Sequence, residues 1–228
     1  MKDWFESFEK SLQGQSASSD LIGAGRASAE NALAHYRYQH ETKIRQAVED
    51  TFVKLLSYLD QEWNKVWESF RSTQPKSPRS LDWYPQVFLE FYLQSDAPLH
   101  LKELARFEHA MEIHSWSHQK LPMISLTEMT SESCLILGHL DLHHFKAPVL
   151  DLYLERGPQD LEQNQTVLFW LMEDGVHFRV MQDWELKVLK NVSHGIEEAL
   201  EYAPQETEAV SSFFKWLGES GLIRQVLN

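Results

Sequence analysis

The sequence predicts an α+β fold, with an all-helical domain over residues 1–124 and a small domain of antiparallel strands and helices over residues 125–228. Up to about residue 118, apolar side chains recur every three or four positions, as they do on helices that bury one face. After Pro122 the polar connector LTEMTSES interrupts this pattern. Beyond it, apolar residues fall in short runs or alternate with polar ones, which is typical of strands and places the boundary near residue 125.

The first domain is predicted to contain four helices. All but the first begin after a small polar residue that can cap a helix, and each continues through an apolar stripe. The segment TQPKSP ends the second helix, because its two prolines cannot continue it. The predicted helices run from Ser28 to Leu59, from a cap at Asp60 through Phe70, from a cap at Ser80 through Tyr92, and from a cap at Asp96 to His118.

The second domain is predicted to begin with strands and to end with three helices. We expect strands in CLILGHLDL and in PVLDLYLERG, which mix apolar runs with alternation. We expect a hairpin in QTVLFWLMEDGVHFRVMQ, because Asp174-Gly175 is a strong turn signal between two apolar segments. The helices are predicted after a cap at Asp183, through Ile196 up to Pro204, and along a buried face formed by Val210, Phe213, Phe214 and Leu217.

The net charge of −13 limits the partners of the chain. Residues 1–120 carry 14 basic and 17 acidic side chains, and residues 121–228 carry 7 and 17. The negative electrostatic field of such a chain repels the phosphate backbone of nucleic acids, so we expect no nucleic acid as a partner. One cysteine, Cys134, excludes an internal disulfide and fits a reducing compartment. The longest apolar run, VLFWLM, is far shorter than the roughly 18 residues of a spanning helix, so we expect a cytoplasmic protein without a membrane partner.

Two groups of histidines have the spacing of metal ligands. His114 and His118 would lie one turn apart on a helix, and His139, Asp141 and His143 alternate in HLDLHH, so they would share one face of a strand. However, His114 also continues the apolar stripe of its helix, and one face of an antiparallel strand is commonly polar and solvated. We therefore expect neither group to hold a metal and no cofactor to bind. A histidine-based metal-binding protein is one alternative function.

Several short motifs between residues 26 and 118 form a familiar pattern: Tyr36-Arg37, Thr51-Phe52, Pro75, Pro78, Ser80-Leu81, Phe88, Phe91, Leu104-Ala105-Arg106 and Glu108. Together they resemble a family formerly labelled as a DNA-binding domain. Its members are partner proteins of multinuclear non-haem iron oxidative enzymes, which modify copper-binding peptides in the bufferin and methanobactin systems. The chain departs from the family where Val53 replaces a usual proline and where Asp60 replaces a usual glycine.

The resemblance implies a non-enzymatic adaptor without catalytic residues. It would form a heterodimer with an iron-dependent barrel-fold oxidative enzyme and present a precursor peptide, in natural product biosynthesis linked to copper homeostasis. The second half resembles the second domain of these partners, which is similar to peptide-recognition modules of modified-peptide biosynthesis. The alternative is a DNA-binding transcriptional regulator, as the former label suggests. That function needs a basic helix, and the mildly basic stretch 37–54 also carries Glu41, Glu49 and Asp50.

Two sites follow as predictions. Arg37 and Glu108 are polar members of otherwise apolar motifs, so we expect a structural ion pair between them. We also expect a peptide to add as a strand beside residues 176–181, in a groove next to the helix that carries Val210, Phe213, Phe214 and Leu217. Arg179 is the basic residue of this strand and is predicted to contact an acidic group of the peptide. Val176, Phe178 and Val180 would share one face of the strand, and His177, Arg179 and Met181 the other.

Overall fold

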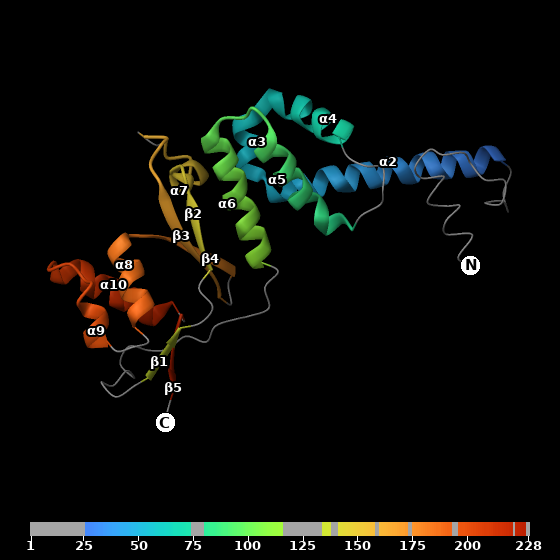
Figure 1. Ribbon diagram of the computed structural model, residues 1–228. Helices are drawn as coiled ribbons and strands as arrows, with labels where there is room; N and C mark the ends of the chain where they lie inside the picture. The colour runs from blue at the N-terminus through green and yellow to red at the C-terminus, as the bar shows by residue number, and fades with distance from the viewer. Residues whose placement is uncertain are drawn as a thin grey trace. The chain divides into compact units, whose positions relative to one another are not determined.

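The structure is a computed structural model of the chain, and it describes residues 26–73, 80–115, 134–137, 141–157, 160–172, 175–192, 196–220 and 222–226. It is mostly helical and contains a small three-stranded antiparallel sheet, which confirms the predicted α+β class. The chain divides into two compact units, residues 1–109 and 110–228, and the division falls within helix α6, Leu99–Ser115. Figure 1 labels this helix and the other main elements. The boundary predicted between residues 124 and 125 lies outside the described residues and stays a prediction.

The first unit is built from helices whose apolar faces meet in one aromatic core. Phe88 lies at the centre of this core, and its ring centroid is 5.1 Å from that of Phe52, 5.5 Å from that of Trp63 and 5.3 Å from that of Phe70. All four rings are buried. The helices are α2 (Arg26–Thr51), α3 (Val53–Leu59), α4 (Trp63–Thr73), α5 (Tyr84–Gln94) and the first part of α6, with short 3₁₀ turns at Asp60–Glu62 and Leu81–Trp83.

The first predicted helix is interrupted at Phe52, which has non-helical dihedral angles (φ −108°, ψ 45°) and separates α2 from α3. The predicted cap at Asp60 is also corrected, because Asp60 ends α3 and donates its backbone N–H to the carbonyl of Leu56. Its φ of 41° lies in the region that glycine adopts most easily. Ser80 precedes a 3₁₀ turn rather than α5 itself, and TQPKSP lies outside the described residues.

The second unit contains the predicted hairpin within a three-stranded antiparallel sheet. The strand order is β2-β3-β4, so β2 and β4 are the edges of the sheet as described. Another pair of strands, β1 and β5, forms a separate two-stranded sheet. Strand β5 was not predicted from the sequence. The strands are β1 (Cys134–Leu137), β2 (Asp141–Phe145), β3 (Gln165–Met172), β4 (Gly175–Met181) and β5 (Ile223–Val226).

The strand predicted in PVLDLYLERG is wrong, because residues Val149–Tyr153 form the short helix α7. Val149 and Leu152 are buried three positions apart, a spacing that a helix uses and that also fits an apolar run in a strand. The three predicted later helices are present as α8 (Asp183–Asn191), α9 (Ile196–Leu200) and α10 (Thr207–Glu219). The cap of α8 is Gln182 rather than Asp183. None of the described helices is long and apolar enough to cross a lipid bilayer.

The two faces of the β2-β3-β4 sheet carry different sets of side chains. Leu168 and Trp170 of β3 and Met181 of β4 belong to a buried cluster with residues of α8, α9 and α10, which gather beside the sheet (Figure 1). Side chains alternate between faces along a strand. Phe169 therefore points to the opposite face, as does Asp141, which is its register partner on β2.

Candidate functional site

Glu108 has different partners from the one that we predicted. Its carboxylate accepts hydrogen bonds from the backbone N–H groups of Lys54, at 2.6 Å, and Leu55, at 2.9 Å. Arg37 is exposed on α2, and within the described part of the chain no ion pair joins it to Glu108. The two N–H groups are in the first turn of α3, where a helix lacks its own backbone acceptors. Glu108 of α6 therefore caps α3 from a distant position in the sequence.

The capping interaction explains why a carboxylate is tolerated in the core of the first unit. The residue before α3 is Phe52, which has no side-chain acceptor for these N–H groups. A negative charge is also favourable at the positive end of a helix. Burial nevertheless raises the pKa of Glu108 to about 7, although the hydrogen bonds from Lys54 and Leu55 oppose this shift. In the described part of the chain, the contacts of Glu108 are those of a helix cap.

The predicted peptide edge corresponds to strand β4. β4 pairs with β3 along its whole length, and among the described residues no strand pairs with its outer side. Leu168 is paired with Arg179, and Phe169 is paired with Phe178, so the residues of β4 alternate faces in the register that the hairpin implies. An edge strand of this kind has main-chain groups on one side that another strand can pair with.

Arg179 does not extend from this edge as a contact for a guest. Its guanidinium forms an ion pair with Glu185 of α8 and lies 4.2 Å from the ring centroid of Trp216 and 5.7 Å from that of Phe213. The Glu185 side chain is only 4% exposed, and its other oxygen accepts the backbone N–H of Gln182. The cation predicted to hold an acidic group of the peptide is therefore neutralised within the protein, between β4, α8 and α10.

The α10 residues predicted to line the groove are not equivalent. Phe213 and Leu217 are buried in the cluster that joins the sheet to the helices. Val210 and Phe214 are half-buried, so part of each side chain is at the surface. On β4, the predicted contact residues Val176, His177, Phe178, Arg179 and Val180 are all half-buried. Phe213 and Leu217 are therefore not available to a guest, whereas Val210 and Phe214 keep some exposed surface.

The opposite face of the sheet carries a cluster that combines members of the two histidine groups. His114 comes from the last turn of α6, and Asp141 and His143 come from β2. Nε2 of His114 is 3.0 Å from Oδ2 of Asp141, and Nε2 of His143 is 3.3 Å from Oδ1 of the same residue. The carboxylate of Asp141 is therefore in contact with two imidazoles, one at each oxygen. His118 and His139 lie outside the described residues.

This cluster was not predicted, because its residues come from two groups that lie far apart in the sequence. The ligand spacing within HLDLHH correctly places Asp141 and His143 on one face, as alternation on a strand requires. Nothing in the local pattern indicates that the end of α6 approaches that face. The apolar context of His114 was the available signal, because a buried histidine needs a polar partner from another element.

Comparisons with known proteins do not identify the chain: no family model matches it, and no curated protein matches it.

Proposed function

We propose that this chain is a non-enzymatic adaptor that binds an iron-dependent peptide-modifying enzyme and presents the precursor peptide to it. The observation that carries the proposal is the position of β4 at the edge of the described sheet. The resemblance of residues 26–118 to partner proteins of such enzymes supports the same function. Peptide presentation needs a surface that accepts an extended chain, and an edge strand provides one.

Strand β4 suits this task because it is regular and long enough for several main-chain hydrogen bonds. It spans Gly175–Met181 and keeps its pairing with β3 throughout. A peptide beside it gains affinity from backbone pairing and specificity from alternate side chains. Val176, Phe178 and Val180 face one side, and His177 faces the other with Arg179. Since Arg179 is held by Glu185, backbone pairing and apolar contacts are the main contribution in this proposal.

The first unit is the proposed docking surface for the enzyme. Tyr38 on α2 and Trp83 before α5 are 71% and 60% exposed. Large aromatic side chains are enriched at protein interfaces, where they supply much of the binding energy. Their exposure supports a role in binding rather than in the core of this unit.

The docking proposal predicts a stable complex with the iron-dependent barrel enzyme. We expect that enzyme and a small cysteine-bearing precursor peptide to be encoded beside the gene for this chain. Co-expressed and analysed by size-exclusion chromatography with light scattering, the chain and the enzyme should elute as a 1:1 heterodimer. Trp83→Ala and Tyr38→Ala should each weaken the complex by about tenfold, as interface aromatics do.

Lys65→Ala is the matched control, because Lys65 is an exposed residue of the same unit whose ion pair with Glu62 is on the surface. It should leave the complex unchanged. Separate elution of the two proteins at micromolar concentration would contradict the docking proposal. A complex that tolerates both aromatic substitutions would contradict the assignment of the surface.

A further inference from the structure

We infer that His114, Asp141 and His143 form a binding site for a divalent transition-metal ion. Two imidazoles and one carboxylate are ligands that Zn²⁺ and Fe²⁺ accept in proteins. One ligand atom from each residue lies within 4.8 Å of the other two. This inference is independent of the proposed peptide edge. It also revises the expectation that neither histidine group holds a metal, since the residues come from both groups.

The separations between the ligand atoms are close to those around a bound ion. With metal–ligand bonds of about 2.0–2.2 Å, two ligand atoms of a tetrahedral ion lie about 3.4 Å apart. The His114–Asp141 and His143–Asp141 contacts measure 3.0 Å and 3.3 Å, and they end on different oxygens of the carboxylate, so an ion would bind one oxygen or bridge both. The two imidazole nitrogens are within 4.8 Å of each other, so a modest change of side-chain angles completes the arrangement. Three protein ligands leave a fourth position for water.

Aromatic side chains hold both imidazoles in place. The ring of Phe169 stacks on His114, at 5.3 Å and 10°, and meets His143 edge-on, at 5.3 Å and 84°. Phe145 stacks on His143, with the two ring centroids 6.1 Å apart. Aromatic contacts of this kind orient the ligand rings. The site is therefore partly preorganised by β2 and β3.

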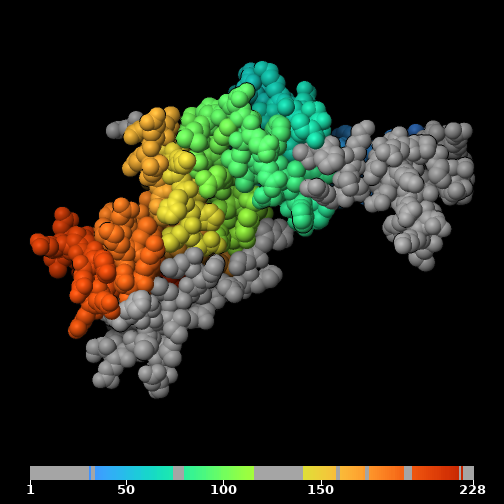
Figure 2. Space-filling view, in the orientation of Figure 1, coloured from blue at the N-terminus to red at the C-terminus, as the bar shows by residue number. Residues whose placement is uncertain are grey.

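The site is also accessible to an ion from solvent. The His114 side chain is only 10% exposed, but the Asp141 and His143 side chains are 39% and 31% exposed. The segment that contains β2, drawn in yellow, reaches the surface on the face shown in Figure 2. With neutral imidazoles, the three ligands carry one negative charge, which favours a divalent cation. An ion can thus reach the carboxylate first and then engage the buried imidazole.

The test is a titration of tag-free, metal-stripped full-length protein with Zn²⁺ alone, followed by isothermal titration calorimetry. We expect one equivalent to bind with a dissociation constant in the micromolar range or below. His143→Ala, Asp141→Asn and His114→Ala should each weaken this binding by at least tenfold. Circular dichroism of each variant reports whether the fold is retained.

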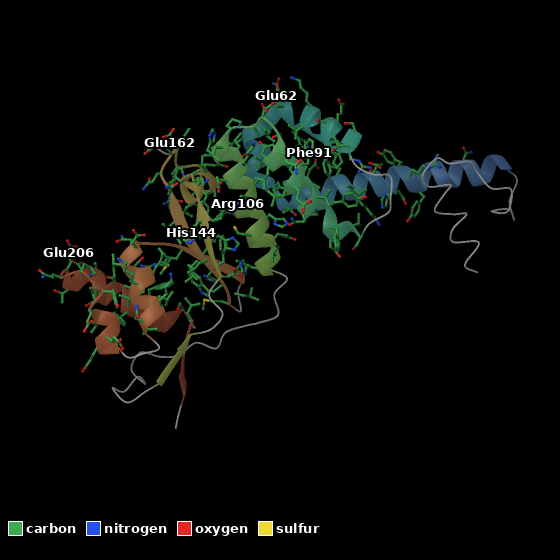
Figure 3. The ribbon with its side chains drawn as sticks, in the orientation of Figure 1. Glu62, Phe91, Arg106, His144, Glu162 and Glu206 are labelled. Atoms are coloured by element: carbon green, nitrogen blue, oxygen red, sulfur yellow. The ribbon has the colours of Figure 1, made fainter. Side chains whose placement is uncertain are left out.

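His144→Ala is the matched control, because His144 follows His143 on β2 (Figure 3) and faces the other side of the sheet. It is exposed, and its Nδ1 is 2.8 Å from Oγ1 of Thr166, so it is an imidazole of the same strand outside the cluster. Its replacement should leave the one-equivalent binding intact. Equal loss in the His144 and His143 variants would overturn the proposal.

A second variant keeps the test decisive if an alanine variant unfolds. His143→Cys retains a metal ligand and replaces imidazole with a thiolate. Addition of Co²⁺ to this variant should produce a sulfur-to-cobalt charge-transfer band that the parent protein lacks. Absence of that band in folded His143→Cys protein, or no saturable Zn²⁺ binding by the parent below about 100 µM, would show that the cluster is only an ion-paired contact between Asp141 and the two imidazoles.

Discussion

Replacing Glu108 by alanine is expected to destabilise the first unit by about 3 kcal/mol, because two N–H groups at the start of α3 lose their acceptor. The structure provides these groups with one carboxylate, and Phe52 before the helix has no side chain that can replace it. Chemical denaturation followed by tryptophan fluorescence measures the change. Amide hydrogen exchange at Lys54 and Leu55 should accelerate more than exchange elsewhere in the unit.

Glu62→Ala is the control for this substitution, since Glu62, labelled in Figure 3, is exposed and forms a surface ion pair with Lys65. It should cost less than about 0.5 kcal/mol. An equal effect of the two substitutions would show that Glu108 does not cap α3. Rescue of Glu108→Ala by an added negative charge at the exposed Val53, next to the same helix start, would support the electrostatic part of the interaction.

The Glu108 carboxyl also gives a specific pH dependence. Its pKa is raised from 4.5 to about 7 by burial, so the folded state binds the proton more tightly than the unfolded state. The resulting contribution to the free energy of unfolding is fully present below about pH 4.5 and is lost as the pH rises through about 7. In Glu108→Gln this contribution is absent. The free energy of unfolding of the parent minus that of the variant should therefore fall as the pH rises from 5 to 8.

Replacing Arg179 by alanine is expected to destabilise the second unit by about 2 kcal/mol. The substitution leaves the nearly buried Glu185 carboxylate without its cation, and it removes the guanidinium from the face of Trp216. Breaking a fully buried pair costs on the order of 3 to 5 kcal/mol, and the lower value here reflects the 30% exposure of Arg179. Thermal unfolding measures the loss.

A double-substitution cycle separates this role from peptide binding. Glu185→Gln in the Arg179→Ala background should recover part of the lost stability, because it removes the unpaired charge. Lys187→Ala, on the exposed side of α8, should have almost no effect. If Arg179→Ala leaves stability unchanged but abolishes peptide capture, the residue serves the guest, as the sequence analysis predicted.

Much of the fold follows from local patterns in the sequence. The helical period identifies the helices of both units, and Asp174-Gly175 marks the hairpin between β3 and β4. The apolar period gives no sign of the interruption at Phe52, because it continues through this residue, and the cap that Glu108 supplies comes from a distant part of the sequence. Val149–Tyr153 was predicted as a strand but forms a helix. An apolar run this short fits the periodicity of a strand and that of a helix equally well.

The candidate sites were predictable to different degrees. The edge position of β4 follows from the order of the elements, because the last strand of a hairpin often ends a sheet. The partner of Arg179 was not predictable, since it requires α8 and α10 to pack on the same face as that side chain. The cluster of His114 with Asp141 and His143 depends on contacts between a helix and a strand that are distant in sequence. Such contacts leave no local periodicity.

Amide hydrogen exchange of the full chain, with and without the precursor peptide encoded beside its gene, tests the adaptor account most directly. If the peptide adds as a strand, alternate amides of β4 become protected when it binds, while the amides of the other edge strand, β2, exchange as before. Saturable binding of the peptide with unchanged exchange along β4 would contradict the account, as would the absence of any binding at micromolar concentration.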